Sequence, residues 1–239
     1  MSICVCIICN KPSEVWLNFL AKFKTYEVFM VVDDNSKQYA HDKVNIVQID
    51  TSECELAGFK RLSFNTGKVT AGWEKAVYYF SRKEYDHVWF IEDDVFFDKE
   101  NVLINIDSTN DADLLCNTVA ADPTTWLWKQ LTIEFPPPYW HAMVCAVRLS
   151  KTLLGLVQQY AKSYGTLFFL EAMFPTLCLR SGLKQASPHE MTYVVYRTDY
   201  TDADITTTHL YHPLKNMLKH LHHRRRLALQ RWVYFKKTT

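Results

Sequence analysis

The sequence contains little glycine, with six residues among 239. So few glycines argue against a collagen-like segment and against a glycine-rich loop that cradles phosphate groups. No apolar run reaches the roughly 18 residues that a membrane-spanning helix needs, and we find no internal repeat or low-complexity tract. The apolar start, SICVCIIC, has no basic leader before it, so we expect no signal peptide.

Cysteine patterns that would indicate disulfides or zinc are also lacking. The seven cysteines are an odd number, and no CxxC pair is followed by a second one. We therefore expect reduced thiols in a core and a cytoplasmic location, because thiols stay reduced in that compartment. An excess of one charge is missing as well, since the formal net charge is +1, which favours no class of partner.

What the sequence does contain suits one soluble domain, with 48% hydrophobic and 22% charged residues. In the first half, residue periodicity alternates between strands and helices, and the strands are apolar on both faces. This pattern predicts an α/β fold in which helices cover a mostly parallel sheet. The expected strands are 3–9, 26–32, 44–49 and 88–91, and the expected helices are 12–23 and 69–83.

The second half is less regular. Ser150 is expected to cap a helix, and Gly182 to end the apolar segment FFLEAMFPTLCLRSGL. A long C-terminal helix is expected from Tyr211 onward, with Pro213 in its first turn. Short strands are expected at 113–118, 142–147 and 193–196.

Acidic clusters follow two of the expected strands, at the edge where α/β sheets bind ligands. Asp33 and Asp34 close MVVDDNS, and Glu92, Asp93 and Asp94 interrupt the apolar run HVWFIEDDVFF. Three adjacent carboxylates repel one another unless a cation or hydrogen-bond donors compensate them. One interpretation is a hard divalent cation such as Mg²⁺ or Mn²⁺, which takes oxygen ligands. The other is an ordinary solvated turn after a strand.

The order of these motifs resembles that of GT-A-fold glycosyltransferases, in which a DxD-type motif follows a buried strand. The resemblance covers most of the chain and is nearest to small soluble nucleotide-sugar-dependent enzymes of bacterial or large-virus glycan pathways. It implies a single GT-A-like domain with a nucleotide-sugar-binding half (1–97), an acceptor-binding half (98–211) and a basic C-terminal helix (212–239). Glu stands at the first position of the motif, which leaves open which acid binds metal.

The resemblance also implies roles for particular residues. Asp94 and His212 would bind Mn²⁺ or Mg²⁺, and His212 would share a helix face with Lys215, three residues on. An ordinary loop or surface position remains the alternative for each of these residues. The donor-binding residues that the resemblance implies are acids at the two strand ends and bases that reach the diphosphate: Asp33, Asp34, Glu92, Asp93, Arg61, Lys68 and Lys215.

Glu171 is the candidate catalytic base. It is the one charged residue in LFFLEAMFP, and burial there would raise its pKa toward neutrality. In inverting members of the family that this chain resembles, a carboxylate at the start of a helix deprotonates the acceptor hydroxyl. The alternative is a structural ion pair with Arg148 or Arg180, and Glu190 and Asp122 are the reserve candidates for the base.

The C-terminal segment KHLHHRRRLALQRWVYFKK is strongly basic. It is amphipathic when it is read as a helix, so it could be a solvated or oligomer-contacting face. It could instead make a peripheral contact with an anionic membrane, which would suit a lipid-linked acceptor. Nucleic acid is the least favoured partner.

These observations favour a metal-dependent glycosyltransferase that moves a sugar from a nucleotide-diphosphate sugar, UDP-linked by preference, to a glycan or lipid-linked acceptor hydroxyl with inversion. A metal-dependent nucleotidyl- or phosphoryl-transferase is the first alternative, although it would be expected to carry a glycine loop or a second carboxylate pair. A non-catalytic binding module with a basic membrane- or nucleic-acid-contacting tail is the other.

Overall fold

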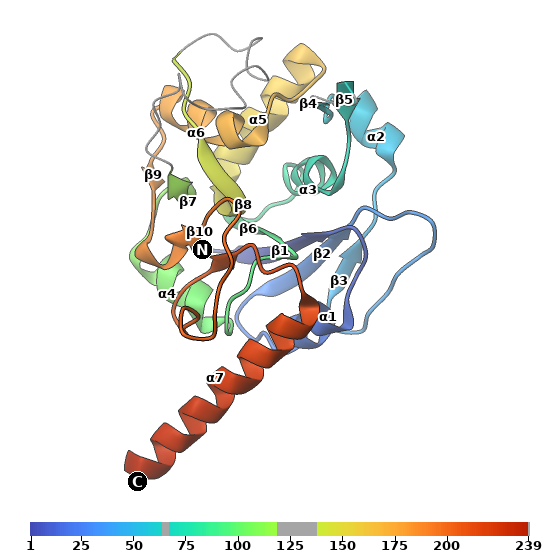
Figure 1. The fold of residues 1–239 in the computed structure, drawn as a ribbon. Coiled ribbons are helices and arrows are strands. Elements are labelled where there is room, and N and C mark those ends of the chain that lie inside the picture. Colours follow the sequence, from blue (N-terminus) through green and yellow to red (C-terminus); the bar gives the residue numbers. More distant parts are fainter. Residues whose placement is uncertain (64–66, 119–137, 239) are drawn as a thin grey trace.

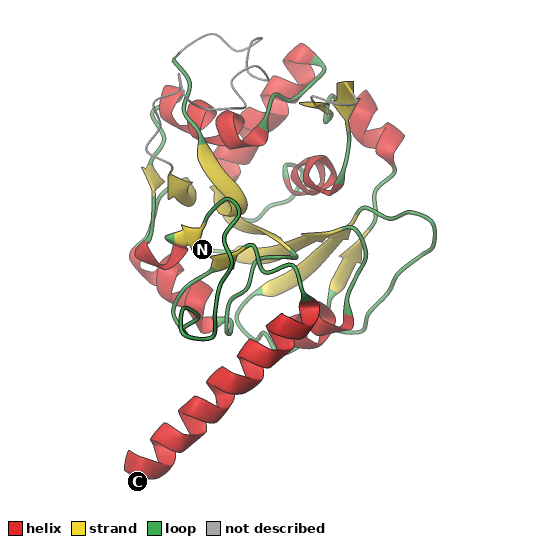
Figure 2. Ribbon diagram, in the orientation of Figure 1, coloured by secondary structure: helices red, strands yellow, loops and turns green. Residues whose placement is uncertain are grey.

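The computed structural model describes residues 1–63, 67–118 and 138–238, with side chains of 62, 63, 67, 68 and 233–238 left undescribed. Seven strands form the central sheet (Figure 1, Figure 2): β1 (Ile3–Cys9), β2 (Glu27–Val32), β3 (Asn45–Val47), β6 (His87–Glu92), β7 (Leu114–Thr118), β8 (Ala142–Ser150) and β9 (Gln185–Ala186). Their spatial order is β3-β2-β1-β6-β8-β7-β9.

The sheet is mixed and mostly parallel. β1, β2, β3 and β6 run parallel to one another, whereas β8 is antiparallel to both β6 and β7. In β1, Cys4 and Cys6 belong to one core cluster, and Val5 and Ile7 belong to the other. Successive side chains point to opposite faces of a strand, so a strand that is apolar at every position is buried on both faces. This architecture confirms the predicted α/β class.

Helices cover both faces of the sheet (Figure 1). The face that carries Cys4 packs against α3, α5 and α6, and the opposite face packs against α1 and α4. Ser150 caps α5 as predicted, since its hydroxyl accepts a hydrogen bond from the Leu153 N–H at 3.1 Å. The helices are α1 (Glu14–Leu20), α2 (Thr51–Leu56), α3 (Gly72–Phe80), α4 (Asn101–Thr109), α5 (Lys151–Tyr164), α6 (Leu170–Arg180), α7 (Met217–Thr238) and the 3₁₀ turn η2 (His189–Met191).

Three sequence expectations were wrong or incomplete. The C-terminal helix begins at Met217, because residues 211–212 form a short strand that pairs with residues 193–194, so Pro213 precedes the helix. The helices α2 and α4 were not predicted. Arg61 and Lys68 lie in a small hairpin rather than in a loop. Within the described ranges, four short strands lie outside the central sheet: β4 (Arg61–Ser63), β5 (Gly67–Val69), β10 (Tyr193–Val194) and β11 (Tyr211–His212).

The helix α7 begins against the body of the molecule, and its C-terminal end projects away from it (Figure 1). The Arg224 guanidinium lies 3.7 Å from the centroid of the Phe19 ring and 5.3 Å from that of Trp16. A second anchor is the ion pair between Arg231 and the buried Asp98. Within the described residues, none of the helices is sufficiently long and apolar to span a membrane.

Arg148 is a buried cation at the centre of the fold, and its replacement should be costly. It pairs with Asp107 at 2.6 Å and donates to the carbonyls of Asn110 and Ala112. We expect Arg148→Met to lower the free energy of unfolding by about 3–5 kcal/mol, because it leaves a buried carboxylate unpaired. Urea unfolding measures the change.

The matched control is Lys184→Met, which removes an ion pair between exposed side chains. Such pairs contribute little, so the urea midpoint of this variant should stay close to that of the wild type. Equal losses in the two variants would contradict the role assigned to Arg148.

Candidate functional site

The acid triplet lies where three parallel strands end together. Ile8 in β1 is opposite Glu92 in β6, and β2 ends beside β1 at Val32. Asp93 and Asp94 form the turn that follows β6. Backbone contacts fix this turn: the indole N–H of Trp16 donates to the Asp93 carbonyl at 2.7 Å, and the Leu214 N–H donates to the Asp94 carbonyl at 2.6 Å.

His212 faces the triplet from β11. Phe96 and Tyr211 exchange two backbone hydrogen bonds, of 2.8 and 2.9 Å, which place the next residue beside the acidic turn. His212 Nε2 lies 3.4 Å from Asp94 Oδ1 and 3.8 Å from Glu92 Oε2. The expectation that His212 and Lys215 share a helix face is corrected, because both residues precede α7.

The hydrogen bonding of His212 determines what can lie between it and Asp94. Nδ1 is 2.7 Å from the Val195 carbonyl oxygen. A carbonyl only accepts, so Nδ1 carries the proton, and Nε2 of the neutral ring presents its lone pair to Asp94. Asp94 Oδ1 is buried and has no hydrogen-bond partner among the described residues. His212 Nε2 and Asp94 Oδ1 are two acceptors that face each other, so either a cation lies between them or the imidazole carries a second proton. The residues at this position are therefore suited to bind a metal ion.

Cys145 lies beside these groups, and ligand atoms of Glu92, Cys145 and His212 all lie within 4.8 Å of one another. Burial, and then the charges of Glu92 and Glu171, raise the pKa of the Cys145 thiol far above its usual range. The thiol is therefore protonated in the metal-free protein, and a cation would have to displace this proton before Cys145 could bind it. Carboxylates with one imidazole suit a hard or intermediate ion such as Mn²⁺.

Trp73 fixes Glu92 and was not predicted as a site residue. Its indole N–H donates to Glu92 Oε1 at 2.6 Å, whereas the sequence pattern indicated only an apolar helix position. Gly72 lets the N-terminus of α3 approach this edge, since a Cβ there would lie 2.8 Å from Ile8 Cγ2. Helical periodicity carries no signal for such a hydrogen bond.

A cavity of about 210 Å³ opens between the two acidic strand ends. Asp33 and Asp93 line it, together with Asn10 and Trp73. Lys75, a second residue that the sequence did not indicate, forms a 2.6 Å ion pair with Asp33. Burial, and then the charges of its two acidic neighbours, raise the pKa of Asp93 to about 6.

Two other predicted donor-binding residues, Asp34 and Arg61, are not among the described residues that line this cavity. Asp34 accepts from the Tyr39 hydroxyl at 2.6 Å and from the Ser36 N–H, and the Tyr39 bond is the main reason why its pKa falls below the usual range. Arg61 forms a 2.6 Å ion pair with the buried Glu74. The side chain of Lys68 lies outside the described residues.

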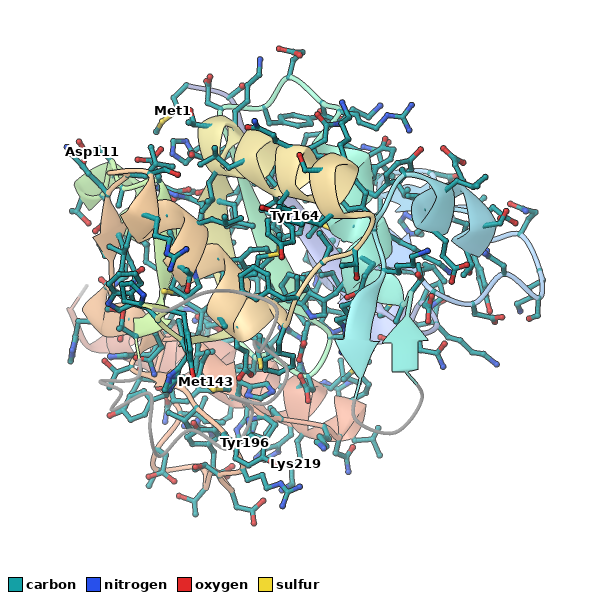
Figure 3. The ribbon with its side chains drawn as sticks, turned by 90° about the horizontal axis from the view of Figure 1, so that it is seen from above. Met1, Asp111, Met143, Tyr164, Tyr196 and Lys219 are labelled. Atoms are coloured by element: carbon teal, nitrogen blue, oxygen red, sulfur yellow. The ribbon has the colours of Figure 1, made fainter. Side chains whose placement is uncertain are left out.

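Lys215 lines a separate cavity of about 360 Å³, and Arg197, Tyr200 and Lys219 line it too. This basic cavity lies beside the triplet, because the N–H of Leu214, another of its lining residues, donates to the Asp94 carbonyl. Figure 3 shows Tyr196 and Lys219 at the same edge of the molecule. Positive and negative surfaces therefore adjoin at this end of the sheet.

Glu171 lies in the first turn of α6, and burial followed by the charge of Glu92 raises its pKa to about 7. Arg148, one of its suggested partners, pairs with Asp107 instead, and Arg180 Nε donates to the Pro138 carbonyl. Within residues 1–63, 67–118 and 138–238, no ion pair reaches Glu171. Of the reserves, Glu190 lies in η2, and Asp122 lies outside the described residues.

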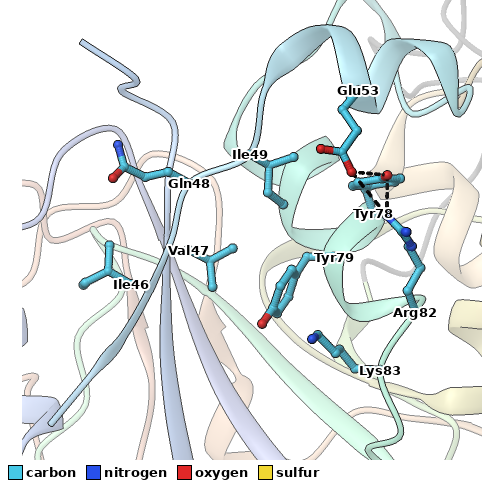
Figure 4. Close-up of a pocket in the computed structure, with 9 residues that line it drawn as sticks. All are labelled: Ile46, Val47, Gln48, Ile49, Glu53, Tyr78, Tyr79, Arg82 and Lys83. Carbon is cyan, nitrogen blue, oxygen red and sulfur yellow. Dashed lines mark hydrogen bonds and ion pairs between the residues drawn. The ribbon is translucent and has the colours of Figure 1, made fainter. Parts of the chain in front are cut away.

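A larger cavity, of about 530 Å³, lies beside β3 and the C-terminal end of α3 (Figure 4). Glu53, Tyr78 and Arg82 interact with one another on one wall, while Val47 and Gln48 line the other. The N-terminus of α3 faces the acidic cavity, so the helix separates the two. None of the described residues that line the larger cavity belongs to the acid triplet.

The raised pKa of Glu171 makes stability depend on pH. A carboxyl group with a higher pKa in the folded state binds more protons there, so stability falls as pH rises from about 4.5 to about 7. In metal-free protein, Glu171→Gln should therefore raise the free energy of unfolding at pH 8 by on the order of 3 kcal/mol, and at pH 5 by less than about 1. Denaturant unfolding across this range measures the difference.

Glu84→Gln, at an exposed position, is the control and should show no such trend. A difference between Glu171→Gln and the wild type that is the same at both pH values would contradict the raised pKa.

Comparisons with known proteins agree with this geometry at the level of the fold. The galactosyltransferase LgtC, solved with donor and acceptor sugar analogs, aligns with a TM-score of 0.52 at 11% identity, over 95% of this chain and 96% of that chain. An active-site mutant of LgtC gives 0.50 at 11% identity, over 90% and 88%. The fold is thus GT-A-like.

Sequence comparison adds a family but no activity. No curated protein matches the chain. The family model described as "Protein of unknown function (DUF3405)" matches residues 97–217, which include Glu171 and His212 and begin just after the acid triplet. The chain therefore belongs to the DUF3405 family of proteins of unknown function.

Proposed function

We propose that the chain is a metal-dependent glycosyltransferase. It would move a sugar from a nucleoside-diphosphate sugar, UDP-linked by preference, to a hydroxyl of a glycan or lipid-linked acceptor. The observation that carries this proposal is the 3.4 Å approach of two hydrogen-bond acceptors, His212 Nε2 and Asp94 Oδ1. The GT-A-like fold, shared with a structure that contains donor and acceptor sugar analogs, supports the same class.

In this proposal Asp94 and His212 hold Mn²⁺ or Mg²⁺, with Glu92 beside them. The imidazole favours Mn²⁺, because Mg²⁺ prefers oxygen ligands alone. Val195 keeps the metal-binding nitrogen of His212 free of its proton, and Trp73 holds the Glu92 carboxylate. When bound, the cation stabilises the negative charge that develops on the departing diphosphate.

Residues 1–97 supply the nucleotide side of the site in this proposal. Asp33, which lines the acidic cavity, and Asp93 accept hydrogen bonds from ribose or donor-sugar hydroxyls. Lys215 lies in the basic cavity beside Asp94 and contacts the diphosphate, since an ammonium group pairs with phosphate as a point charge. Asp34 and Arg61 have supporting roles at most, because neither is among the described residues that line the cavity. Lys68 is proposed to contact the diphosphate, as the resemblance implies.

Residues 98–211 supply the acceptor side. Glu171 takes the proton of the acceptor hydroxyl while that oxygen attacks the anomeric carbon and the bond to the diphosphate oxygen breaks. A pKa of about 7 suits a general base at neutral pH. Attack opposite the leaving group inverts the anomeric configuration, which NMR of the product sugar reports directly.

The proposal is tested by calorimetric titration with a panel of nucleoside-diphosphate sugars, with and without Mn²⁺. We expect one or more of these donors to bind, and to bind at least tenfold more tightly with the metal present. Failure of every donor to bind with Mn²⁺ would exclude the proposed activity.

Asp94→Ala isolates the metal site. Its Oδ1 has no hydrogen-bond partner in the part of the chain that the structure describes, so we expect the melting temperature of metal-free protein to change little. Mn²⁺-stimulated donor hydrolysis or transfer should fall at least a hundredfold, as is typical when a preorganised charge-stabilising group is lost. The control is Asp111→Ala, at the opposite edge of the molecule from Lys219 (Figure 3). Unchanged Mn²⁺ dependence in Asp94→Ala would remove the assignment.

Glu171→Gln separates donor binding from transfer. The amide keeps the shape of the side chain but cannot take a proton, so transfer should fall at least a hundredfold. Donor affinity, measured by the same calorimetry, should stay within about twofold of the wild type, since the residue contacts the acceptor only. A matching loss of donor affinity would instead indicate a structural or donor-side role.

A further inference from the structure

A second cluster of metal-binding side chains lies away from the acid triplet, where α7 meets the loop after β10. Ligand atoms of Asp202, His222 and His223 all lie within 4.8 Å of one another. His222 Nε2 is 3.0 Å from Asp202 Oδ2, and His223 Nδ1 is 3.4 Å from Asp202 Oδ1. The two histidines belong to the segment HHRRR, which the sequence presented only as part of a basic tail.

The burial of His223 indicates that its Nδ1 binds a group in addition to the side chains around it. Its side chain is 3% exposed, against 57% for His222 and 56% for Asp202. Its Nδ1 is buried and makes no hydrogen bond with any residue that the structure describes, although a carboxylate oxygen of Asp202 lies 3.4 Å away. A buried polar nitrogen without a partner is costly, and a bound ion removes the cost.

The loop presents Asp202 in a fixed position. Thr201 donates through both its N–H and its hydroxyl to Asp204 Oδ2, each at 2.7 Å, which closes a turn around Asp202. His223 packs against Phe96, with ring centroids 5.6 Å apart. The ligands therefore come from a closed turn and a helix, which are rigid elements suited to a metal site.

From this geometry we propose that Asp202, His222 and His223 bind Zn²⁺ and fasten the start of α7 to the loop at residues 199–204. Two imidazoles and one carboxylate are a zinc donor set, with the fourth position left to water. Donor atoms about 2.0–2.1 Å from a tetrahedral zinc lie roughly 3.4 Å apart, close to the separations in this cluster. The site is independent of the sugar-transfer proposal.

The zinc would also support the candidate active site. The hydroxyl of Tyr200, two residues before Asp202, donates to the carbonyl of Tyr193 at 2.6 Å and also lies 3.2 Å from the carbonyl of His212. On the helix side, His220 Nε2 contacts the Leu214 carbonyl at 2.6 Å, and Leu214 in turn binds Asp94. Fastening α7 to the loop thus holds both sides of the strand that carries His212.

The test uses the full chain carrying Asp94→Ala, in which the triplet site is disabled. After chelator treatment and dialysis, Co²⁺ is titrated while visible absorption is followed, and Zn²⁺ is then added as a competitor. We expect one Co²⁺ per chain with the intense bands of four-coordinate cobalt, and displacement by one equivalent of Zn²⁺. At about 100 times its dissociation constant, Zn²⁺ should raise the melting temperature by about 5–10 °C.

Adding Asp202→Asn or His222→Ala to that background should weaken Zn²⁺ binding at least tenfold and abolish the rise in melting temperature. Both side chains are more than half exposed, so the fold should persist, and circular dichroism checks that it does. His41→Ala is the matched control and should bind as the background does. Zn²⁺ binding that is absent from the background, or unchanged by Asp202→Asn and His222→Ala, would overturn the proposal.

Discussion

The meeting of His212 Nε2 with the unpartnered Asp94 oxygen is the interaction on which the site depends. It joins the end of β6 to a strand near the C-terminus, and the backbone bridge between Phe96 and Tyr211 keeps the two in contact. The Val195 carbonyl orients the imidazole so that it cannot donate a hydrogen bond to Asp94 while neutral. A cation would satisfy both acceptors, and the other acidic groups of the site, Glu92 and Asp93, lie beside them.

The pairing of charged side chains also points to the candidate site. Away from the site, the buried Arg148 and Glu74 each have an ion-pair partner, Asp107 and Arg61 respectively. At the site, by contrast, burial and neighbouring carboxylates raise the pKa values of Asp93 and Glu171. Perturbed groups that gather in a cleft are typical of functional sites.

The C-terminal segment belongs to the site although its helix projects from the body (Figure 1). Residues 211–216 carry His212 and Lys215, and the first turns of α7 pack through Arg224 against Phe19 and Trp16. Trp16 also holds the Asp93 carbonyl, so the anchor of the helix and the acidic turn share a side chain. A change in the packing of α7 would therefore alter the position of the acidic turn at Asp93 and Asp94.

The sequence by itself determined the α/β class, the strand that ends in the acids and the capping role of Ser150, because these depend on local periodicity and local hydrogen bonds. It also singled out Glu171 from its apolar neighbours. It did not determine the start of α7, since a backbone pairing between residues distant in sequence converts positions 211–212 into a strand. The contacts of Trp73 with Glu92, of Lys75 with Asp33 and of His223 with Asp202 were likewise decided only by the tertiary structure. Each joins segments that periodicity treats separately, and only the folded chain brings their side chains within a few ångströms.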